Sequence, residues 1–369
     1  MQVSRRSVFV GGAALLIAGA RGGGAGAADG WEATDRLCRS LVEDRRSPGL
    51  SVALGQGGTL RFARAYGSAD VGAGRAARPD TTFRIASIAK PMVGALFLRL
   101  RRAGVLDLED PLARWVPEFP RAREVTLRML LNHTSGLGEY TRTPLAQLTR
   151  EAAIDYAGEA IVARMAATRP LFRSEPGDRW AYSNTGYVLL GVVAERAGGR
   201  PIAELLEREV ARPAGLTSIA WDEPADPQGA RGHALQDGRW IAAPHVSASF
   251  MGASGAIRST AADLCRWGEA LVDGRVLDAR ELQEMTAPAR PRRHRNPPPY
   301  GLGVFSGEAF GRRVLYHTGS TAGFSADWRC YPADGMAVAM VANADAGRME
   351  SAPQAIRKAA LEAALGRLL

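Results

Sequence analysis

Residues 87–100 read SIAKPMVGALFLRL, and the organisation of the chain follows from this stretch. Its apolar side chains recur every three to five residues, which predicts a helix that begins near Ser87 and ends near Gly104. Pro91 fits only this start, because the first four N–H groups of a helix have no partner within it. Residues three apart on a helix are neighbours, so Lys90 is expected beside Ser87.

Strand-like segments lie on both sides of this helix along the chain. LSVAL at 50–54 and LRFARAY at 60–66 are separated by Gly-Gln-Gly-Gly, which predicts a hairpin. Short apolar runs return after the proline-rich stretch 296–299, and a closing helix is predicted at 349–368. These later strand runs cover 303–305, 314–317 and 336–341.

The sequence between the two groups of strands is mostly helical, with the clearest helices predicted at 161–167, 187–197, 202–210 and 260–272. This order predicts an α/β fold with an antiparallel sheet flanked by helices, built from both chain ends, plus an inserted all-helical lobe.

We expect a single catalytic unit over 28–369, with its active site in the cleft between two lobes. The α/β lobe is predicted at about 28–95 and 297–369, and the helical lobe at about 96–296.

The composition is ordinary for a globular protein, with 46% hydrophobic and 23% charged residues. Lys90 and Lys358 are the two lysines, the other 45 basic residues are arginine, and the net charge is +9. The densest basic cluster, at 290–295, is interrupted by Pro291, so it is interpreted as a solvated loop rather than a nucleic-acid surface. No nucleic-acid partner is expected.

The N-terminus predicts export. Ser4-Arg5-Arg6-Ser7 precedes an apolar run at 8–20, which is shorter than the roughly 20 residues of a membrane-spanning helix. We expect a signal peptide at 1–27 with a twin-arginine pair, a general secretory signal being the alternative. The protein would then be periplasmic or secreted, without a stable membrane anchor. Export permits disulfides, but three well-separated cysteines favour buried thiols, with a single bridge as the alternative.

Several common catalytic sites are excluded. The sequence contains no Gly-x-Ser-x-Gly, no Cys-x-x-Cys, no phosphate-binding loop and no dinucleotide fingerprint, and its five histidines are isolated. We therefore expect no metal and no cofactor.

The remaining chemistry is that of Ser87 and Lys90. A serine hydroxyl is a weak nucleophile until a base takes its proton, and a lysine does this when its surroundings leave it neutral. Two further motifs follow in the chain, Tyr182-Ser183-Asn184 and His317-Thr318-Gly319. Each motif alone has a chance frequency of roughly 0.03–0.1, but all three in this order have one near 5 × 10⁻⁵.

The chain resembles the serine β-lactamase and penicillin-binding-protein superfamily, in the branch of class C β-lactamases, DD-peptidases and esterases. The resemblance implies a β-lactamase/transpeptidase-like fold with a site between its lobes. It departs from the Lys-Thr-Gly form of the third motif, since His317 replaces the lysine. It rests on the three motifs and on VTLRMLLNHTSGL (125–137), PGDRWAYSNTGYVLLG (176–191), STAADLCRW (259–267) and YHTGSTAGF (316–324).

The resemblance implies roles for the motif residues. Ser87 is the acylated nucleophile, and Lys90 and Tyr182 share the base and proton-relay role, with the order left open. Asn184 binds the substrate amide. The backbone N–H groups of Ser87 and Ser320 form the oxyanion hole.

In the third motif, Thr318 would bind a substrate carboxylate, and Gly319 would allow close backbone approach. His317 is expected to carry a positive charge at low pH and to lose it by about pH 8, weakening carboxylate binding. His133, in the Asn-His-Thr-Ser-Gly turn, is interpreted as a packing and turn residue rather than a base.

The sequence thus predicts an exported serine hydrolase that acts through an acyl-enzyme on an amide or ester. Its substrate would be a small molecule or a peptide, cell-wall peptide included. DD-carboxypeptidase-like or esterase-like activity is favoured, because histidine in the third motif resembles those members. The alternatives are a class C-like β-lactamase and a penicillin-binding or sensor protein that acylates without turnover.

Overall fold

The computed structural model describes residues 28–142, 145–222, 226–349 and 351–369. The expected signal peptide, residues 1–27, lies outside the described residues. Within them, no helix is both long and apolar enough to cross a lipid bilayer.

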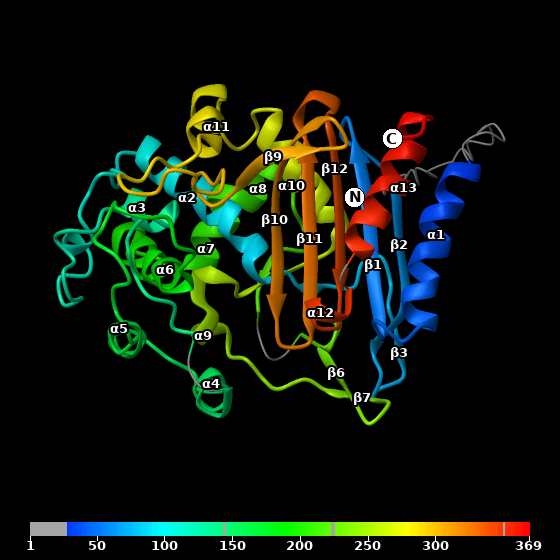
Figure 1. Ribbon diagram of the computed structural model, residues 1–369, viewed down its shortest axis with the longest axis horizontal. Coiled ribbons are helices and arrows are strands. Elements are labelled where there is room, and N and C mark those ends of the chain that lie inside the picture. Colours follow the sequence, from blue (N-terminus) through cyan, green and yellow to red (C-terminus); the bar gives the residue numbers. More distant parts are fainter. Residues whose placement is uncertain (1–27, 143–144, 223–225, 350) are drawn as a thin grey trace, which may run out of the picture.

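A seven-stranded antiparallel sheet forms the centre of the protein (Figure 1). The strand order is β3-β2-β1-β12-β11-β10-β9, so strands from the two ends of the chain meet where β1 pairs with β12. Leu50 lies opposite Ala342 in this central pair. The strands are β1 Gly49–Gln56, β2 Thr59–Asp70, β3 Arg75–Ala76, β9 Phe305–Ala309, β10 Arg312–Thr321, β11 Phe324–Tyr331 and β12 Met336–Ala342.

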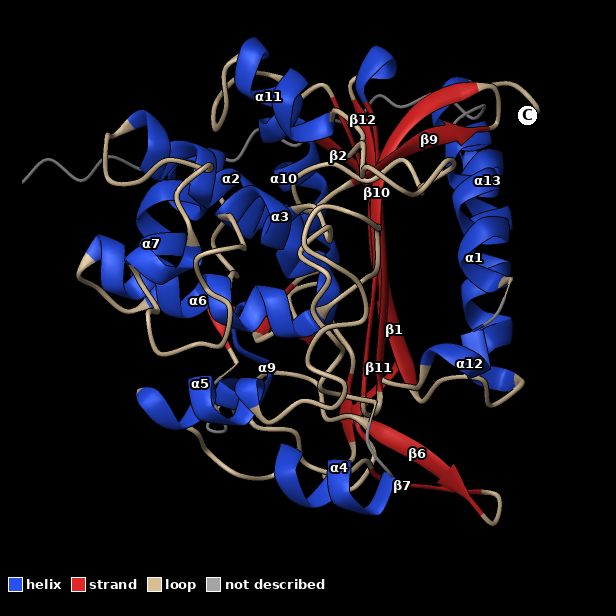
Figure 2. Cartoon of the chain, turned by 60° about the vertical axis from the view of Figure 1, so that its left-hand side comes forward, coloured by secondary structure: helices blue, strands red, loops and turns tan. Residues whose placement is uncertain are grey.

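Helices cover both faces of the sheet, which explains why β1 and β12 are almost continuously apolar. On one face α1 (Ala28–Glu43) packs against α13 (Ala352–Leu365), and on the other α10 (Ala261–Val272) lies across β1 and β12 (Figure 2). The predicted fold class is confirmed.

The other helices gather beyond α10, on the same side of the sheet (Figure 2). They are α2 Ala89–Arg102, α3 Leu127–Leu131, α4 Leu145–Ala152, α5 Glu159–Ala166, α6 Asn184–Gly198, α7 Ile202–Leu206, α8 Arg212–Ala214, α9 Ala248–Met251 and α11 Ala279–Thr286. The exception is α12 (Ala346–Met349), which lies on the side of the sheet that α1 and α13 cover (Figure 2). Short 3-10 turns occupy Ala86–Ile88, Leu112–Arg114, Gly252–Ser254 and Pro332–Asp334, and a π turn occupies Glu207–Ala211.

Most predicted elements are present, including the hairpin at 50–66 and the helix predicted to begin near Ser87, which is α2 and follows the 3-10 turn at Ala86–Ile88. Other elements differ from the prediction. The strands β3 to β8 and β11 are not among the predicted ones, and β5 to β8 lie within the segment predicted as an all-helical lobe. Strand β9 covers Phe305–Ala309 rather than 303–305. The closing helix is divided into α12 and α13, with Pro353 near the start of the second, where a proline is tolerated.

A small sheet of β4 (Phe83–Arg84), β8 (Ile257–Ser259) and β5 (Ala220–Trp221) holds the segment just before Ser87. Asp222 pairs with both Arg84 and Arg258 at 2.5 Å, and all three side chains are at least nine-tenths buried. A two-stranded sheet, β6 (His233–Gln236) with β7 (Arg239–Ala242), lies at the molecule's lower edge in Figure 1.

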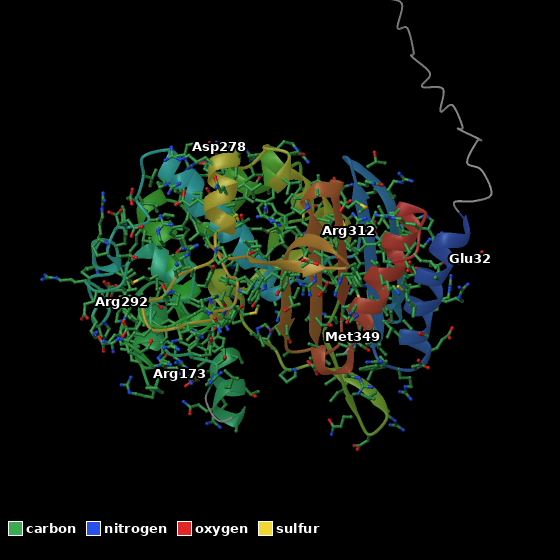
Figure 3. The ribbon with its side chains drawn as sticks, turned by 45° about the horizontal axis from the view of Figure 1, so that its top comes forward. Glu32, Arg173, Asp278, Arg292, Arg312 and Met349 are labelled. Carbon is green, nitrogen blue, oxygen red and sulfur yellow. The ribbon has the colours of Figure 1, made fainter. Side chains whose placement is uncertain are left out.

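The cysteines and the basic cluster behave as the sequence indicates. Cys38, Cys265 and Cys330 are buried free thiols. The segment 290–295 is a surface loop, in which Figure 3 labels Arg292. The exposed Arg292 and Arg293 pair with Asp178.

Candidate active site

Ser87 lies in the 3-10 turn Ala86–Ile88, which leads directly into α2. The residue before it, Ala86, has φ +46°, a backbone conformation that costs about 1–3 kcal/mol for a residue with a Cβ. Such conformations persist only where the surroundings enforce them. The turn packs closely against Gly319 of β10, where a Cβ would meet the Ile85 carbonyl oxygen at 2.0 Å.

Lys90 is fully buried in the first turn of α2, and its ammonium nitrogen has three oxygen partners. Nζ lies 2.9 Å from Ser87 Oγ, 2.7 Å from Asn184 Oδ1 and 2.7 Å from the Ser254 carbonyl oxygen. The last two oxygens only accept hydrogen bonds. A neutral Lys90 therefore donates both N–H groups to them and directs its lone pair at the Ser87 hydroxyl.

Tyr182 also lies within hydrogen-bond distance of the Ser87 hydroxyl. Its Oη lies 2.9 Å from Ser87 Oγ. Tyr182 ends the loop that leads into α6, where Ser183 caps the helix by accepting a hydrogen bond from the Gly186 N–H. This cap places Asn184 at the first position of α6, with Tyr182 two residues earlier.

Burial has opposite consequences for these two groups, because it disfavours whichever form is charged. Desolvation lowers the pKa of Lys90 to about 7, against the opposing charge of Glu139. Desolvation raises the pKa of Tyr182 above its usual value, and the hydrogen bond with Ser87 offsets part of that rise. Near neutral pH, Lys90 is therefore present in both its protonated and its neutral form, whereas the Tyr182 hydroxyl stays protonated.

His317 differs from the expectation of a titrating cation. Its side chain is 2% exposed, Nδ1–H donates to the Thr318 carbonyl oxygen at 2.6 Å, and Nε2 lies 3.3 Å from the Tyr300 hydroxyl. Desolvation, with a smaller contribution from Lys90, lowers the pKa of His317 to about 3. His317 is therefore neutral across the working range, because this site excludes the water that would solvate its charge.

The other residues of the third motif lie on different sides of β10. Gly319 faces the Ser87 turn, whereas the exposed Thr318 lies in a hollow on the opposite face, with Asp327 and Arg329 of β11. Ser320 borders both this hollow and the cavity beside Ser87. The structure thus brings together Ser87, Lys90, Tyr182, Asn184 and Ser320, but not the side chain of Thr318.

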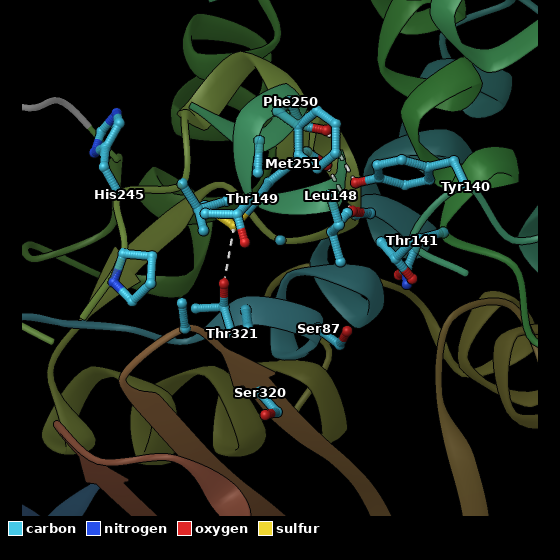
Figure 4. Close-up of a pocket in the computed structure, with 18 residues that line it drawn as sticks. Ser87, Tyr140, Thr141, Leu148, Thr149, His245, Phe250, Met251, Ser320 and Thr321 are labelled. Carbon is cyan, nitrogen blue, oxygen red and sulfur yellow. Dashed lines mark hydrogen bonds between the residues drawn. The ribbon is translucent and has the colours of Figure 1, made fainter. Parts of the chain in front are cut away.

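A cavity of about 350 Å³ opens beside Ser87 (Figure 4). Its far wall is apolar and includes Leu148 of α4 together with Phe250 and Met251 of α9. Among the described residues that line it there is no lysine, arginine, aspartate or glutamate. The cavity therefore fits an uncharged, apolar group attached to the atom that Ser87 attacks.

Two residues beside the site have roles that the motifs do not indicate. Glu139, in the stretch GLGEY, accepts a hydrogen bond from the Asn184 N–H at 2.7 Å. Tyr300 is fully buried and lies against both His133 and His317. No spacing pattern in the sequence marks either residue.

His133 is buried at a turn with φ +62°, and its ring lies 4.3 Å from that of Tyr182. Its Nδ1 accepts a hydrogen bond from the Ser183 N–H. Desolvation lowers its pKa well below the usual value. Within the described part of the chain, no group of three or more His, Cys, Asp or Glu residues is arranged to hold a metal ion.

The sequence model of the Beta-lactamase family matches residues 34–361. The chain is 36% identical over 195 residues to the esterase EstB of Burkholderia gladioli, and 34% identical over 181 residues to penicillin-binding protein 4* of Bacillus subtilis. Each match covers 49% of this chain, and they cover 49% and 39% of the two relatives, so the chain spans about half or less of these relatives' length.

Solved structures match over more of the chain. The D-amino acid amidase of Ochrobactrum anthropi SV3, solved with L-phenylalanine amide, has a TM-score of 0.77 at 26% identity, over 92% of this chain and 99% of that one. The octameric penicillin-binding protein homologue of Pyrococcus abyssi has a TM-score of 0.76 at 23% identity, covering 91% and 77%. At that identity, the second likeness shows the fold alone.

Proposed function

This chain belongs to the beta-lactamase family, and we propose that it hydrolyses uncharged esters or amides with an apolar acyl group through an acyl-enzyme on Ser87. The proposal rests on the Ser87–Lys90–Tyr182 cluster and on the cavity beside it, whose described lining residues include no lysine, arginine, aspartate or glutamate.

In the first step, neutral Lys90 takes the hydroxyl proton as Ser87 Oγ bonds to the substrate carbonyl carbon. The backbone N–H groups of Ser87 and Ser320 would stabilise the resulting oxyanion. When the bond to the leaving group breaks, Tyr182 passes its proton to the departing oxygen or nitrogen, and the proton held by Lys90 replaces it. Water then cleaves the acyl-enzyme, releasing the acid and restoring Ser87.

Lys90 rather than Tyr182 is the first base in this scheme. A general base works best when its pKa lies near the operating pH. Burial has brought the pKa of Lys90 to about 7 and moved that of Tyr182 further away. Deprotonation of Tyr182 would place a phenolate in the same dry site, whereas deprotonation of Lys90 removes a charge from it.

The preference for an uncharged substrate follows from the third motif. His317 is neutral, and Thr318 faces away from the cavity. A substrate carboxylate placed in this cavity would lose water without meeting a lysine or an arginine among the described lining residues, which is costly. Similarity to an esterase and to a D-amino acid amidase supports an ester or amide as the bond that is cleaved.

DD-peptidase-like activity is the second candidate, and one observation favours it. Arg329 lines the same hollow as Thr318, on the face of β10 that points away from Ser87. A substrate carboxylate that extended past β10 into this hollow would meet the Arg329 cation. Asp327 already pairs with Arg329 at 2.8 Å and with Arg357 at 2.6 Å, leaving one positive charge in excess.

A side-by-side substrate panel tests the proposal. Esters of increasing acyl length, an amino acid amide, a D-Ala-D-Ala peptide, a cephalosporin and a fluorescent penicillin are compared with the wild type and with Ser87→Ala. Turnover of neutral esters or the amide, absent in Ser87→Ala, is expected. Preferential cleavage of the peptide or the cephalosporin, or penicillin labelling without turnover, would overturn the proposal in favour of those functions.

We also propose that the protein is exported by the twin-arginine route, on the basis of Arg5 and Arg6. Expression of the full chain with Arg5→Lys and Arg6→Lys should retain it in the cytoplasm. Secretion at the wild-type level would indicate the general secretory route.

A further inference from the structure

Glu139 places a carboxylate at the start of α6. Its Oε2 accepts a hydrogen bond from the Asn184 N–H at 2.7 Å. Its Oε1 accepts from the N–H and the hydroxyl of Thr141 at 3.2 and 3.0 Å. Both carboxylate oxygens are thus engaged, and the side chain is held in one orientation.

Asn184 connects this carboxylate to Lys90. Its backbone N–H faces Glu139, and its side-chain Oδ1 accepts a hydrogen bond from Lys90 Nζ at 2.7 Å. Asn184 is also the first residue of α6, and the N-terminus of a helix of 15 residues carries a partial positive charge. Without Glu139, that positive end would face the lysine with no neighbouring carboxylate to offset it.

We propose that Glu139 is a positioning residue of the acylation reaction, which holds Asn184 against Lys90 and whose negative charge sets the pH at which Lys90 releases its proton. The inference rests on the proposed function, since it assigns a role to a residue that acts through the base. Glu139 itself is absent from the described lining of the cavity, so it acts at a distance from the substrate.

The other groups around Lys90 carry no charge near neutral pH. Nζ lies 5.0 Å from the ring of Tyr182 and 5.1 Å from that of Tyr187, and burial raises the pKa of both phenols. His133 and His317 both have lowered pKa values, so neither is a cation there. Glu139 is the charged group that opposes the desolvation of Lys90.

The lysine content of the chain allows a direct test. Lys90 and Lys358 are its two lysines, so protein labelled with 13C at lysine Cε gives two side-chain NMR signals. Lys358 is half-exposed on α13 and serves as the internal reference. Titration of the Lys90 signal reads its protonation without any substrate.

Glu139→Gln is the test variant and Glu195→Gln the matched control. Glu195 also accepts a hydrogen bond from the first N–H of a helix, that of Ile202 in α7, but it is absent from the contacts of Lys90. Both substitutions remove a carboxylate from a helix N-terminus. Only the first removes a charge beside the base.

We expect the Lys90 titration midpoint to fall by roughly one pH unit or more in Glu139→Gln, and to stay at the wild-type value in Glu195→Gln. The acid limb of kcat/KM for a neutral ester should move by the same amount. An unmoved midpoint in Glu139→Gln, or an equal shift in Glu195→Gln, would overturn the inference.

A second variant covers the case in which Glu139→Gln does not fold. Glu139→Asp retains the charge but displaces Asn184, so kcat should fall while the Lys90 midpoint stays within a few tenths of a pH unit. A fall of a full unit in this variant contradicts the inference. Failure of the proposed function would appear differently, as a wild-type protein in which Lys90 titrates but Ser87 forms no adduct with a phosphonate ester.

Discussion

Gly319 and Ile85 are in backbone contact, with room for no side-chain atom between them: a Cβ on Gly319 would lie 2.0 Å from the Ile85 carbonyl oxygen. Strand β10 is thereby pressed against the turn that presents Ser87. This backbone contact, which has no rotamer freedom, holds the nucleophile in place relative to the sheet.

Gly319→Ala should therefore displace the Ser87 turn. Overpacking of this kind costs about 1–3 kcal/mol of stability. A displacement near 1 Å costs roughly 10²-fold in rate, so acylation should fall by about that factor. Phosphonate labelling and thermal unfolding measure the two effects. Gly347→Ala is the control, since a Cβ there meets nothing within 4 Å; equal labelling rates in both variants would contradict the argument.

Lys90→Arg should abolish most of the activity although it conserves charge. Arginine keeps its proton at any working pH, so it accepts none from Ser87. The rate of acylation should fall by about 10²–10⁴-fold. Lys358→Arg, the same substitution at the half-exposed lysine, should leave the rate unchanged. Acylation at the wild-type rate in Lys90→Arg would mean that Tyr182 or water is the base.

Tyr182→Phe keeps the ring that packs on His133 but removes the hydroxyl 2.9 Å from Ser87 Oγ. Loss of a proton donor should slow amide cleavage by about 10²-fold or more. A p-nitrophenyl ester should suffer much less, because its leaving group departs without a proton. Steady-state kinetics on the two substrates provide the comparison, and equal losses on both would show that the hydroxyl does not protonate the leaving group.

The pH dependence should come from Lys90 and not from His317. As the pH rises through about 7, Lys90 becomes neutral, and kcat/KM for a neutral ester should rise and level off. The pKa of His317 is about 3, so the ratio of kcat/KM for a carboxylate-bearing substrate to that for a neutral one should be flat between pH 6 and 8. A ratio that falls as the pH rises from 6 to 8 would instead support the positively charged His317 that the sequence predicts.

The same lysine affects stability. The pKa of Lys90 is about 7 in the folded protein and 10.5 ordinarily. At a pH between these two values, Lys90 is protonated in the unfolded chain but not in the folded one. Stability rises with pH wherever the unfolded state binds more protons, so the Lys90 contribution should make the fold more stable from about pH 7 upward. Urea unfolding of the wild type and Lys90→Met at pH 7 and 9 isolates this contribution. An equal change in the free energy of unfolding in both proteins would contradict it.

Leu148→Trp should narrow the cavity from the α4 side. Long acyl chains should lose at least about tenfold in kcat/KM relative to an acetyl ester, because extra volume in a packed site displaces the group that fills it. Ile154→Trp, at an exposed position two residues beyond α4, should leave the preference unchanged. An unchanged chain-length profile in Leu148→Trp would place the acyl group elsewhere.

Local spacing accounts for what the sequence predicts well. The proximity of Ser87 and Lys90 follows from helix geometry alone, and the hairpin from two apolar runs around glycines. The roles of Tyr182 and Asn184 are predicted only from the family resemblance. Spacing does not reveal their contacts with Ser87 and Lys90, because these residues are more than 90 positions apart in the chain.

The features that escape prediction depend on contacts between distant residues. Asp327 and Arg329 interrupt the apolar pattern of β11, yet both are buried or half-buried, because Asp327 pairs with Arg329 and with Arg357 of α13. Glu139 reaches Asn184 across 45 positions. The neutral state of His317 depends on the burial of that ring beside Tyr300, which no spacing in the sequence encodes.

The central pairing of β1 with β12 has a consequence for the order of folding. During synthesis, β1, β2 and the entire helical insertion leave the ribosome before β12 exists, so the nascent chain carries β1 with an unpaired apolar edge. Pairings between chain segments so far apart form slowly, which prolongs the exposure of this edge to chaperones or to other chains. A chain that stops before Met336 would lack the middle of its sheet rather than its margin, leaving two half-sheets that each present an open edge.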